Sequence, residues 1–160
     1  MKSTQLKKFF PALVLAVVMF GVFTQSNLAV AQDSNLVTVI AKAPFAQTVD
    51  AFRTMVAKNG MMVLSELNQG KILSMTGMKL NTVTLFVGNP TIGKKLFSAN
   101  HGVGVAIPVR INIYEGADGK TLINYVKPSA QLAFFPNEAI QKVGAMLDKK
   151  LAMLTSMLSK

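Results

Sequence analysis

The chain has 160 residues, and its 17 lysines and arginines outnumber its 7 acidic residues. With 51% hydrophobic and 15% charged residues it is too apolar to be disordered, and its length fits a single domain. It contains no cysteine, which excludes disulfides, thiol redox chemistry and thiolate metal sites.

Residues 1–31 follow the pattern of a secretory signal peptide. Three lysines precede an uncharged apolar run over residues 9–23, and the segment ends in the cleavage signature Ala29-Val30-Ala31. We expect export, to the periplasm first and to the medium as the alternative. Removal of those three lysines leaves the mature chain, from Gln32, with 14 basic and 7 acidic groups. A retained membrane anchor is the other interpretation, but the run is shorter than the about 20 residues that span a membrane.

The first half of the mature chain alternates strands and helices. β-branched residues predict a strand over residues 36–40, and apolar residues at helical spacing predict a helix from Phe45 to the stop signal Asn59-Gly60. A second strand is expected over residues 61–67, a loop with one helical turn over 68–81, and a third strand over 82–87. Asn89 and Pro90 are a favoured N-cap and first helical residue, so a short helix should run to about Ala99.

Residues 103–114 show the clearest period of two in the chain. We predict one half-buried strand over this whole span, with a bulge or a sheet edge at Pro108. The residues expected to face the core are Val103, Val105, Ile107, Val109, Ile111 and Ile113.

The C-terminal part predicts a hairpin and a long helix. Asp118-Gly119 is hairpin chemistry, residues 121–126 form the returning strand, and Pro128 ends it. An apolar stripe predicts an amphipathic helix over residues 137–158. The order β-α-β-β-α-β-β-α predicts an α+β fold over residues 32–160, with a single antiparallel or mixed sheet and helices packed on one face.

Several short motifs occur between about residues 45 and 135. They are Thr48-Val49 before Gly60, Leu85-Phe86-Val87-Gly88-Asn89-Pro90 with Gly93, Ile107-Pro108 before Tyr114, Asp118-Gly119-Lys120, and Tyr125-Val126-Lys127-Pro128. Together they resemble the bacterial family known as domain of unknown function 302. The resemblance implies a compact α+β domain without an established activity. Members often carry an Asp-His pair where this chain has Leu67-Asn68, so any metal or acid–base role of that pair is not transferred. They also tend to have Thr-Pro-Leu-Met where this chain has the more basic Lys94-Lys95-Leu96-Phe97.

Residues 88–95 nearly match a phosphate-binding loop between a strand and a helix. Lys95 replaces the hydroxyl residue that holds magnesium, and Pro90 removes an amide, so nucleotide hydrolysis is not predicted. A helix N-terminus at Asn89 beside Lys94 and Lys95 is suited to hold an anion, and the alternative is an ordinary capped helix.

His101 is the single histidine, and no carboxylate or nucleophile lies beside it in the sequence. A turn residue is therefore expected rather than a catalytic one. Thioethers bind Cu(I), and Met75 and Met78 with Met61, Met62 or His101 are the combination that offers a copper site. The alternative is that the methionines fill the core, and no cofactor is predicted.

Arg110, Asn112 and Tyr114 should project from the sheet face opposite the apolar row, with Tyr125 across the hairpin from them. An arginine with aromatic residues is typical of a ligand or partner surface, and the alternative is an ordinary solvated face. The positive charge favours acidic partners or an anionic membrane surface. Nucleic-acid binding is not expected, because the lysines occur in short pairs without a recognition motif.

No set of residues for catalysis can be assembled, so we do not expect an enzyme. We expect an exported binding module for a small or amphiphilic ligand or a protein partner. The candidate ligand-binding residues are Asn89, Lys94, Lys95, His101, Arg110, Asn112, Tyr114 and Tyr125. The alternative is a homo-oligomeric structural or interaction domain, such as a homodimer, without a small ligand. Anion and copper binding are lesser alternatives.

Overall fold

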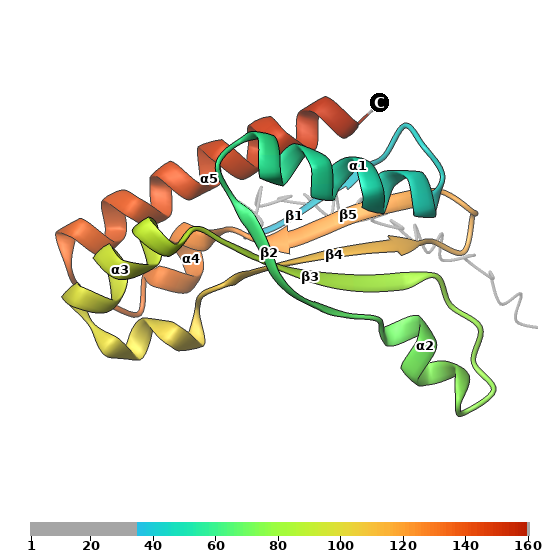
Figure 1. The fold of residues 1–160 in the computed structure, drawn as a ribbon, viewed down its shortest axis with the longest axis horizontal. Coiled ribbons are helices and arrows are strands. Elements are labelled where there is room, and N and C mark those ends of the chain that lie inside the picture. The colour runs from blue at the N-terminus through green and yellow to red at the C-terminus, as the bar shows by residue number, and fades with distance from the viewer. Residues whose placement is uncertain (1–34, 160) are drawn as a thin grey trace, which may run out of the picture. The chain divides into compact units, whose positions relative to one another are not determined.

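The computed structural model describes residues 35–159, so the predicted signal peptide lies outside the described part. Within it, five strands form one antiparallel sheet in the order β1-β5-β4-β3-β2, which confirms the predicted α+β class (Figure 1). The strands are β1 (Leu36–Ile40), β2 (Met62–Leu67), β3 (Thr82–Gly88), β4 (Val109–Glu115) and β5 (Thr121–Val126).

Two long helices, α1 (Phe45–Lys58) and α5 (Glu138–Leu158), lie along one side of the sheet (Figure 1). Shorter helices make the connections: α2 (Gln69–Ser74), α3 (Pro90–Ala99), the 3₁₀ helix η1 (His101–Val105) and α4 (Pro128–Leu132). Among residues 35–159, no helix combines the length and the apolar character needed to cross a membrane.

The main core lies between the sheet and the two long helices. Val109, Ile111 and Ile113 of the central strand β4 are each 2% exposed or less, and they belong to one cluster with Phe52 of α1 and Leu151 of α5. Full burial of such a side chain contributes about 1.5–3 kcal/mol. This layer is therefore the main source of stability in a domain that has no disulfide.

The long strand predicted over residues 103–114 is wrong in its first half. Val103 and Val105 lie in η1, where Val105 is 81% exposed, and the strand begins only at Val109. Pro108 lies in neither a bulge nor an edge strand, because it comes directly before β4, which is the middle strand of the sheet. Its peptide bond with Ile107 is cis. Since proline has no N–H to donate to a ladder on either side, β4 starts after it.

A second, smaller apolar cluster explains the burial of Val103. It joins Leu96 of α3, Val103 of η1, Leu132 of α4 and Ile140 in the first turn of α5. The sequence did not predict α4, which Pro128 begins at the first helical position. Asp148 of α5 fixes α4 in place, since it accepts hydrogen bonds from the Ser129 backbone N–H at 3.0 Å and from the Ser129 hydroxyl.

The side of the sheet that faces away from α1 and α5 is called the open face here. It carries alternate residues of all five strands. These are Leu36, Thr38 and Ile40 of β1, Leu122, Asn124 and Val126 of β5, Arg110, Asn112 and Tyr114 of β4, Thr82, Thr84 and Phe86 of β3, and Met62, Ser65 and Leu67 of β2.

We predict that Gly144→Ala destabilises the domain by about 1–3 kcal/mol, because the added Cβ would lie 2.9 Å from Cα of Ser129 and force α4 and α5 apart. Gly93→Ala is the matched control in α3, where an added Cβ meets nothing within 4 Å. It should be neutral or stabilise by up to about 1 kcal/mol. Urea unfolding measures both changes, and equal effects of the two substitutions would contradict the close approach of α4 to α5.

Candidate apolar ligand pocket

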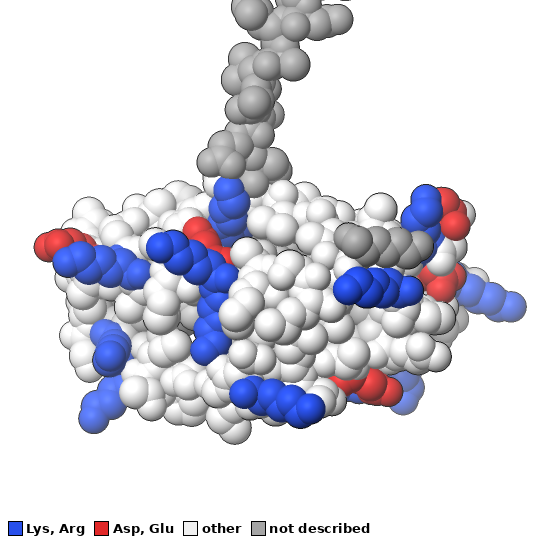
Figure 2. Space-filling view, turned by 90° about the horizontal axis from the view of Figure 1, so that it is seen from above, with Lys and Arg blue, Asp and Glu red and all other residues white. Residues whose placement is uncertain are grey.

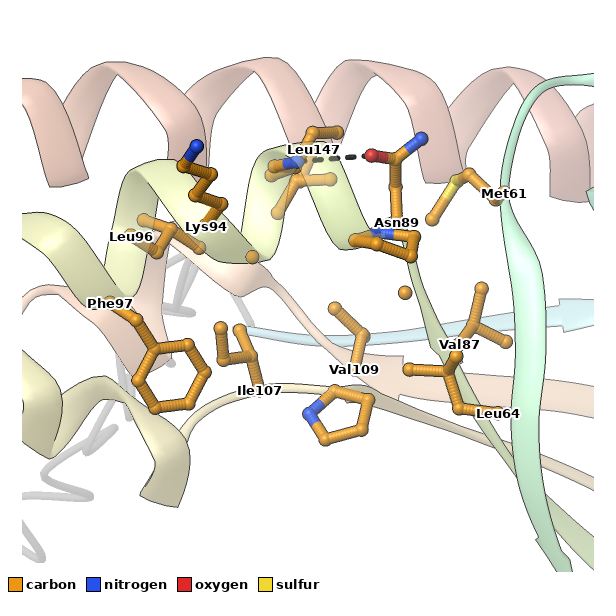
Figure 3. Close-up of a pocket in the computed structure, with 15 residues that line it drawn as sticks. Met61, Leu64, Val87, Asn89, Lys94, Leu96, Phe97, Ile107, Val109 and Leu147 are labelled. Atoms are coloured by element: carbon orange, nitrogen blue, oxygen red, sulfur yellow. Dashed lines mark hydrogen bonds between the residues drawn. The ribbon is translucent and has the colours of Figure 1, made fainter.

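An apolar pocket lies at one end of the sheet, between α3, the end of β3 and the segment that leads into β4 (Figure 3). Its volume is about 410 Å³, which falls in the range of small-molecule sites. Side chains from several elements line it: Met61, Leu64, Val87, Pro90, Ile92, Leu96, Phe97, Ile107, Pro108, Val109 and Leu147.

Helix α3 forms one wall of the pocket. Gly93, Leu96 and Phe97 lie at three- and four-residue spacing and therefore on one face of the helix. Leu96 is buried, whereas Phe97 is 42% exposed at the rim. Because Gly93 has no side chain and an added Cβ would meet nothing within 4 Å, this glycine leaves space for the cavity.

The opposite wall comes from β2 and from the segment before β4. The pairing of β2 with β3 is irregular between Val63 and Ser65, and Leu64 at this position is 50% exposed. Its side chain lies directly over Gly88, where an added Cβ would be 2.8 Å from Leu64 Cδ1. Ile107 and Pro108 then approach from the other side (Figure 3).

The polar groups at the pocket are already engaged or turned outward. The Asn89 side chain accepts from the Ile92 backbone N–H at 3.0 Å and donates to the Gly60 carbonyl at 2.6 Å. Figure 3 shows the amine of Lys94 pointing away from the apolar side chains, so only the stem of Lys94 lines the pocket. The interior therefore suits an apolar group. Asn89 is the N-cap of α3, and its hydrogen bond to Gly60 connects α3 to the turn after α1.

The other predicted ligand residues do not gather at this pocket. Lys95 is exposed on α3 outside the lining, and His101 is exposed at the start of η1. Among the described residues, no group of three or more His, Asp or Glu side chains is placed to hold a metal ion. Figure 2 shows lysines and arginines scattered over the side that carries α1 and α5, rather than gathered in one stripe.

The methionine combination considered as a lesser alternative for copper binding is not assembled either. Met61 is 3% exposed and lines the apolar pocket just before β2, whereas Met75 follows α2 and is 85% exposed. The strand β2 lies between Met61 and α2, and its six residues span about 20 Å. Met61 precedes the start of β2, and Met75 lies beyond its other end, after α2, so their thioethers are too far apart to bind one ion.

Arg110, Asn112 and Tyr114 do lie on the open face, where they pair with Phe86, Thr84 and Thr82, respectively. The expected position of Tyr125 beside them is wrong. Tyr125 is 3% exposed on the helix side of β5, within the main core. Burial raises the pKa of its phenol above the usual value, although a hydrogen bond with Thr155 acts in the opposite direction.

The chain belongs to the family described as domain of unknown function DUF302, whose model matches residues 37–159. A crystal structure of a DUF302 protein from Bacillus stearothermophilus superimposes with a TM-score of 0.69 over 74% of this chain and 94% of that chain. At 23% sequence identity this likeness shows the fold alone.

Curated relatives share 28% identity over 98 residues, which is 61% of this chain. They are the proteins named fluoride-specific ion channel FluC 1 from Brucella suis biovar 1 and from Brucella abortus biovar 1. The chain spans 39% of the first relative's length and 36% of the second's, so most of each relative lies outside the match.

We predict that Asn89→Ala destabilises the domain by about 1–2 kcal/mol, because it removes both the cap of α3 and the hydrogen bond to Gly60. Asn89→Ser keeps a cap acceptor and should recover about half of that loss. Denaturant unfolding compares the two variants. Wild-type stability in Asn89→Ala would instead leave Asn89 free to act as a ligand residue.

Proposed function

We propose that this domain is an exported, non-enzymatic binding module that holds a small apolar or amphiphilic ligand in the pocket between α3 and the Ile107-Pro108 segment. The observation that carries the proposal is an apolar cavity of about 410 Å³ whose neighbouring polar groups are engaged elsewhere. The signal-peptide pattern of residues 1–31 supports export.

The size of the cavity limits the ligand. At about 30 Å³ for a group the size of water, it holds roughly a dozen non-hydrogen atoms. Each buried methylene contributes about 0.8 kcal/mol, so a chain of about eight carbons gains roughly 6 kcal/mol before the cost of association. A medium-length acyl chain or a single substituted ring fits these limits.

The charge at the rim favours an anionic head group on that ligand. Lys94 and Lys95 are exposed on α3, and the stem of Lys94 runs along the pocket while its ammonium group stays in water. A carboxylate or phosphate at the end of an acyl chain would meet these lysines outside the apolar interior. The ligand class is therefore an anionic amphiphile.

Catalysis and fluoride handling find no support in the pocket. Its lining has no histidine, carboxylate or hydroxyl residue that would act as a nucleophile or general base. A fluoride ion needs hydrogen-bond donors to replace its water, whereas the Asn89 amide at the pocket donates to Gly60 and the Lys94 amine points away from the interior. The activity in the relatives' name is therefore not proposed for this pocket.

We predict that the wild-type domain binds the neutral fluorescent probe 1-naphthylamine, which is small enough for the cavity, and that octanoate displaces it. Gly93→Leu places a branched side chain in the space beside Leu96 and Phe97 and should weaken probe binding by about tenfold or more, equivalent to about 1.4 kcal/mol. Thr91→Leu, on an exposed position of the same helix outside the lining, is the matched control and should bind as the wild type does.

Two results would contradict the proposed function. One is a wild-type domain that produces no fluorescence change with the probe. The other is equal binding by Gly93→Leu and Thr91→Leu, which would place the probe elsewhere on the surface. Native mass spectrometry of the protein purified from its own cells would then identify what, if anything, it carries.

A further inference from the structure

The open face of the sheet is almost without charge in a strongly basic protein. Of the fifteen side chains that the strand register places there, only Arg110 is charged. The chain from Gln32 onward nevertheless has 14 basic and only 7 acidic groups. On the side that carries α1 and α5, lysines and arginines are scattered over the surface (Figure 2).

The open face also exposes large apolar side chains near one edge of the sheet. Leu36 and Ile40 of β1 are 49% and 42% exposed, and Val126 of β5 is 38% exposed. Leu122 lies beside them, paired with Ile40. A patch of exposed apolar side chains of this kind is typical of an interaction site.

A row of neutral polar residues divides this patch. Thr38, Asn124, Asn112 and Thr84 are direct neighbours across four strands. At the far end of the row, Gln69 at the start of α2 donates to the Thr84 hydroxyl at 2.5 Å and covers that threonine. The uncovered part of the row therefore centres on Asn124 and Asn112.

The residues on either side of this row are complementary under a two-fold rotation. When the two-fold axis runs along the row, midway between the two facing sheets, Asn124 of one copy lies opposite Asn124 of the other. The same rotation exchanges positions two residues before and after the row. Leu122 then faces Val126 of the second copy, and Ile40 faces Leu36, so apolar side chains meet apolar side chains.

The single charge on the face is also accommodated by this rotation. Arg110 and Tyr114 flank Asn112 on β4, so Arg110 of one copy meets Tyr114 of the other. An arginine over a tyrosine ring is a favourable cation–π contact. At the centre, the carboxamides of Asn112 and Asn124 from the two copies would exchange hydrogen bonds and fix the register of the contact.

We propose that the open face is a homodimer interface, in which two copies pack their sheets face to face about a two-fold axis along the Thr38–Thr84 row. Charge selects a second copy as the occupant. Two basic molecules repel each other least where neither carries charge, whereas an acidic partner or an anionic lipid surface would be drawn to the lysines beside α1 and α5. Packed sheets lie about 10 Å apart with their strands within about 30°, which gives a sandwich with the helix layers outside.

Sedimentation velocity over a wide range of concentrations tests the proposal. We expect a wild-type dimer, a monomer for Asn124→Lys, and a dimer for Ala145→Lys, which adds the same charge at an exposed position on α5. Two lysines at the two-fold axis would face each other without a counter-ion. Their repulsion should raise the dissociation constant of the dimer at least a hundredfold, which is equivalent to about 2.7 kcal/mol. Thr38→Lys, on an edge strand, replaces Asn124→Lys if circular dichroism shows that the latter is unfolded.

A second readout uses the absence of cysteine from the chain. Asn124→Cys should be cross-linked into covalent dimers by a short bismaleimide, because the sheets would lie about 10 Å apart. Ala145→Cys should form no covalent dimer under the same treatment. A wild type that is monomeric at every concentration would overturn the proposal, and so would an Asn124→Lys variant that dimerises as well as Ala145→Lys. The interface does not use the apolar pocket, so this result is independent of probe binding.

Discussion

The contact between the buried side of β4 and the two long helices holds this domain together. Val109, Ile111 and Ile113 lie in the middle strand, and their neighbours on β3 and β5 continue the same apolar layer. The chain has no cysteine, so no disulfide adds to this contact. The layer also reaches the candidate pocket, because Val109 and Leu147 belong to both the core and the pocket lining. The ligand site is thus an opening at the end of the core.

Local signals in the sequence were enough to predict most elements of the fold. Asn89 is the predicted N-cap, and its side chain accepts from the Ile92 backbone N–H. Asn137 plays the same part for α5 by accepting from the Ile140 backbone N–H. The period of two failed at residues 103–108, where alternating glycines and valines give the same pattern in a 3₁₀ helix. The pattern contains no information on hydrogen bonds, and Pro108 was the sign that a ladder could not continue through it. The five-residue helix α4 is too short for any periodicity to reveal it.

The candidate site was less accessible to prediction, because its walls come from elements distant in sequence. The near match to a phosphate-binding loop drew attention to Asn89 and Lys94, which lie at the pocket but leave it apolar. Gly93 in the middle of a helix was the available clue, since glycine there is costly unless the space is needed. For Tyr125 the sequence was ambiguous. Apolar residues occur on both sides of β5, so alternation could not distinguish the core side from the open face.

The most direct test of the central contact is a pair of substitutions of one residue type at a buried and an exposed site. Ile111→Ala truncates a fully buried side chain on β4, whereas Ile72→Ala truncates one on α2 that is 47% exposed. Urea unfolding at fixed protein concentration should show a loss of about 2–5 kcal/mol for Ile111→Ala and less than about 1 kcal/mol for Ile72→Ala. Similar losses for the two variants would contradict the account, because β4 would then not be the strand on which the helices depend.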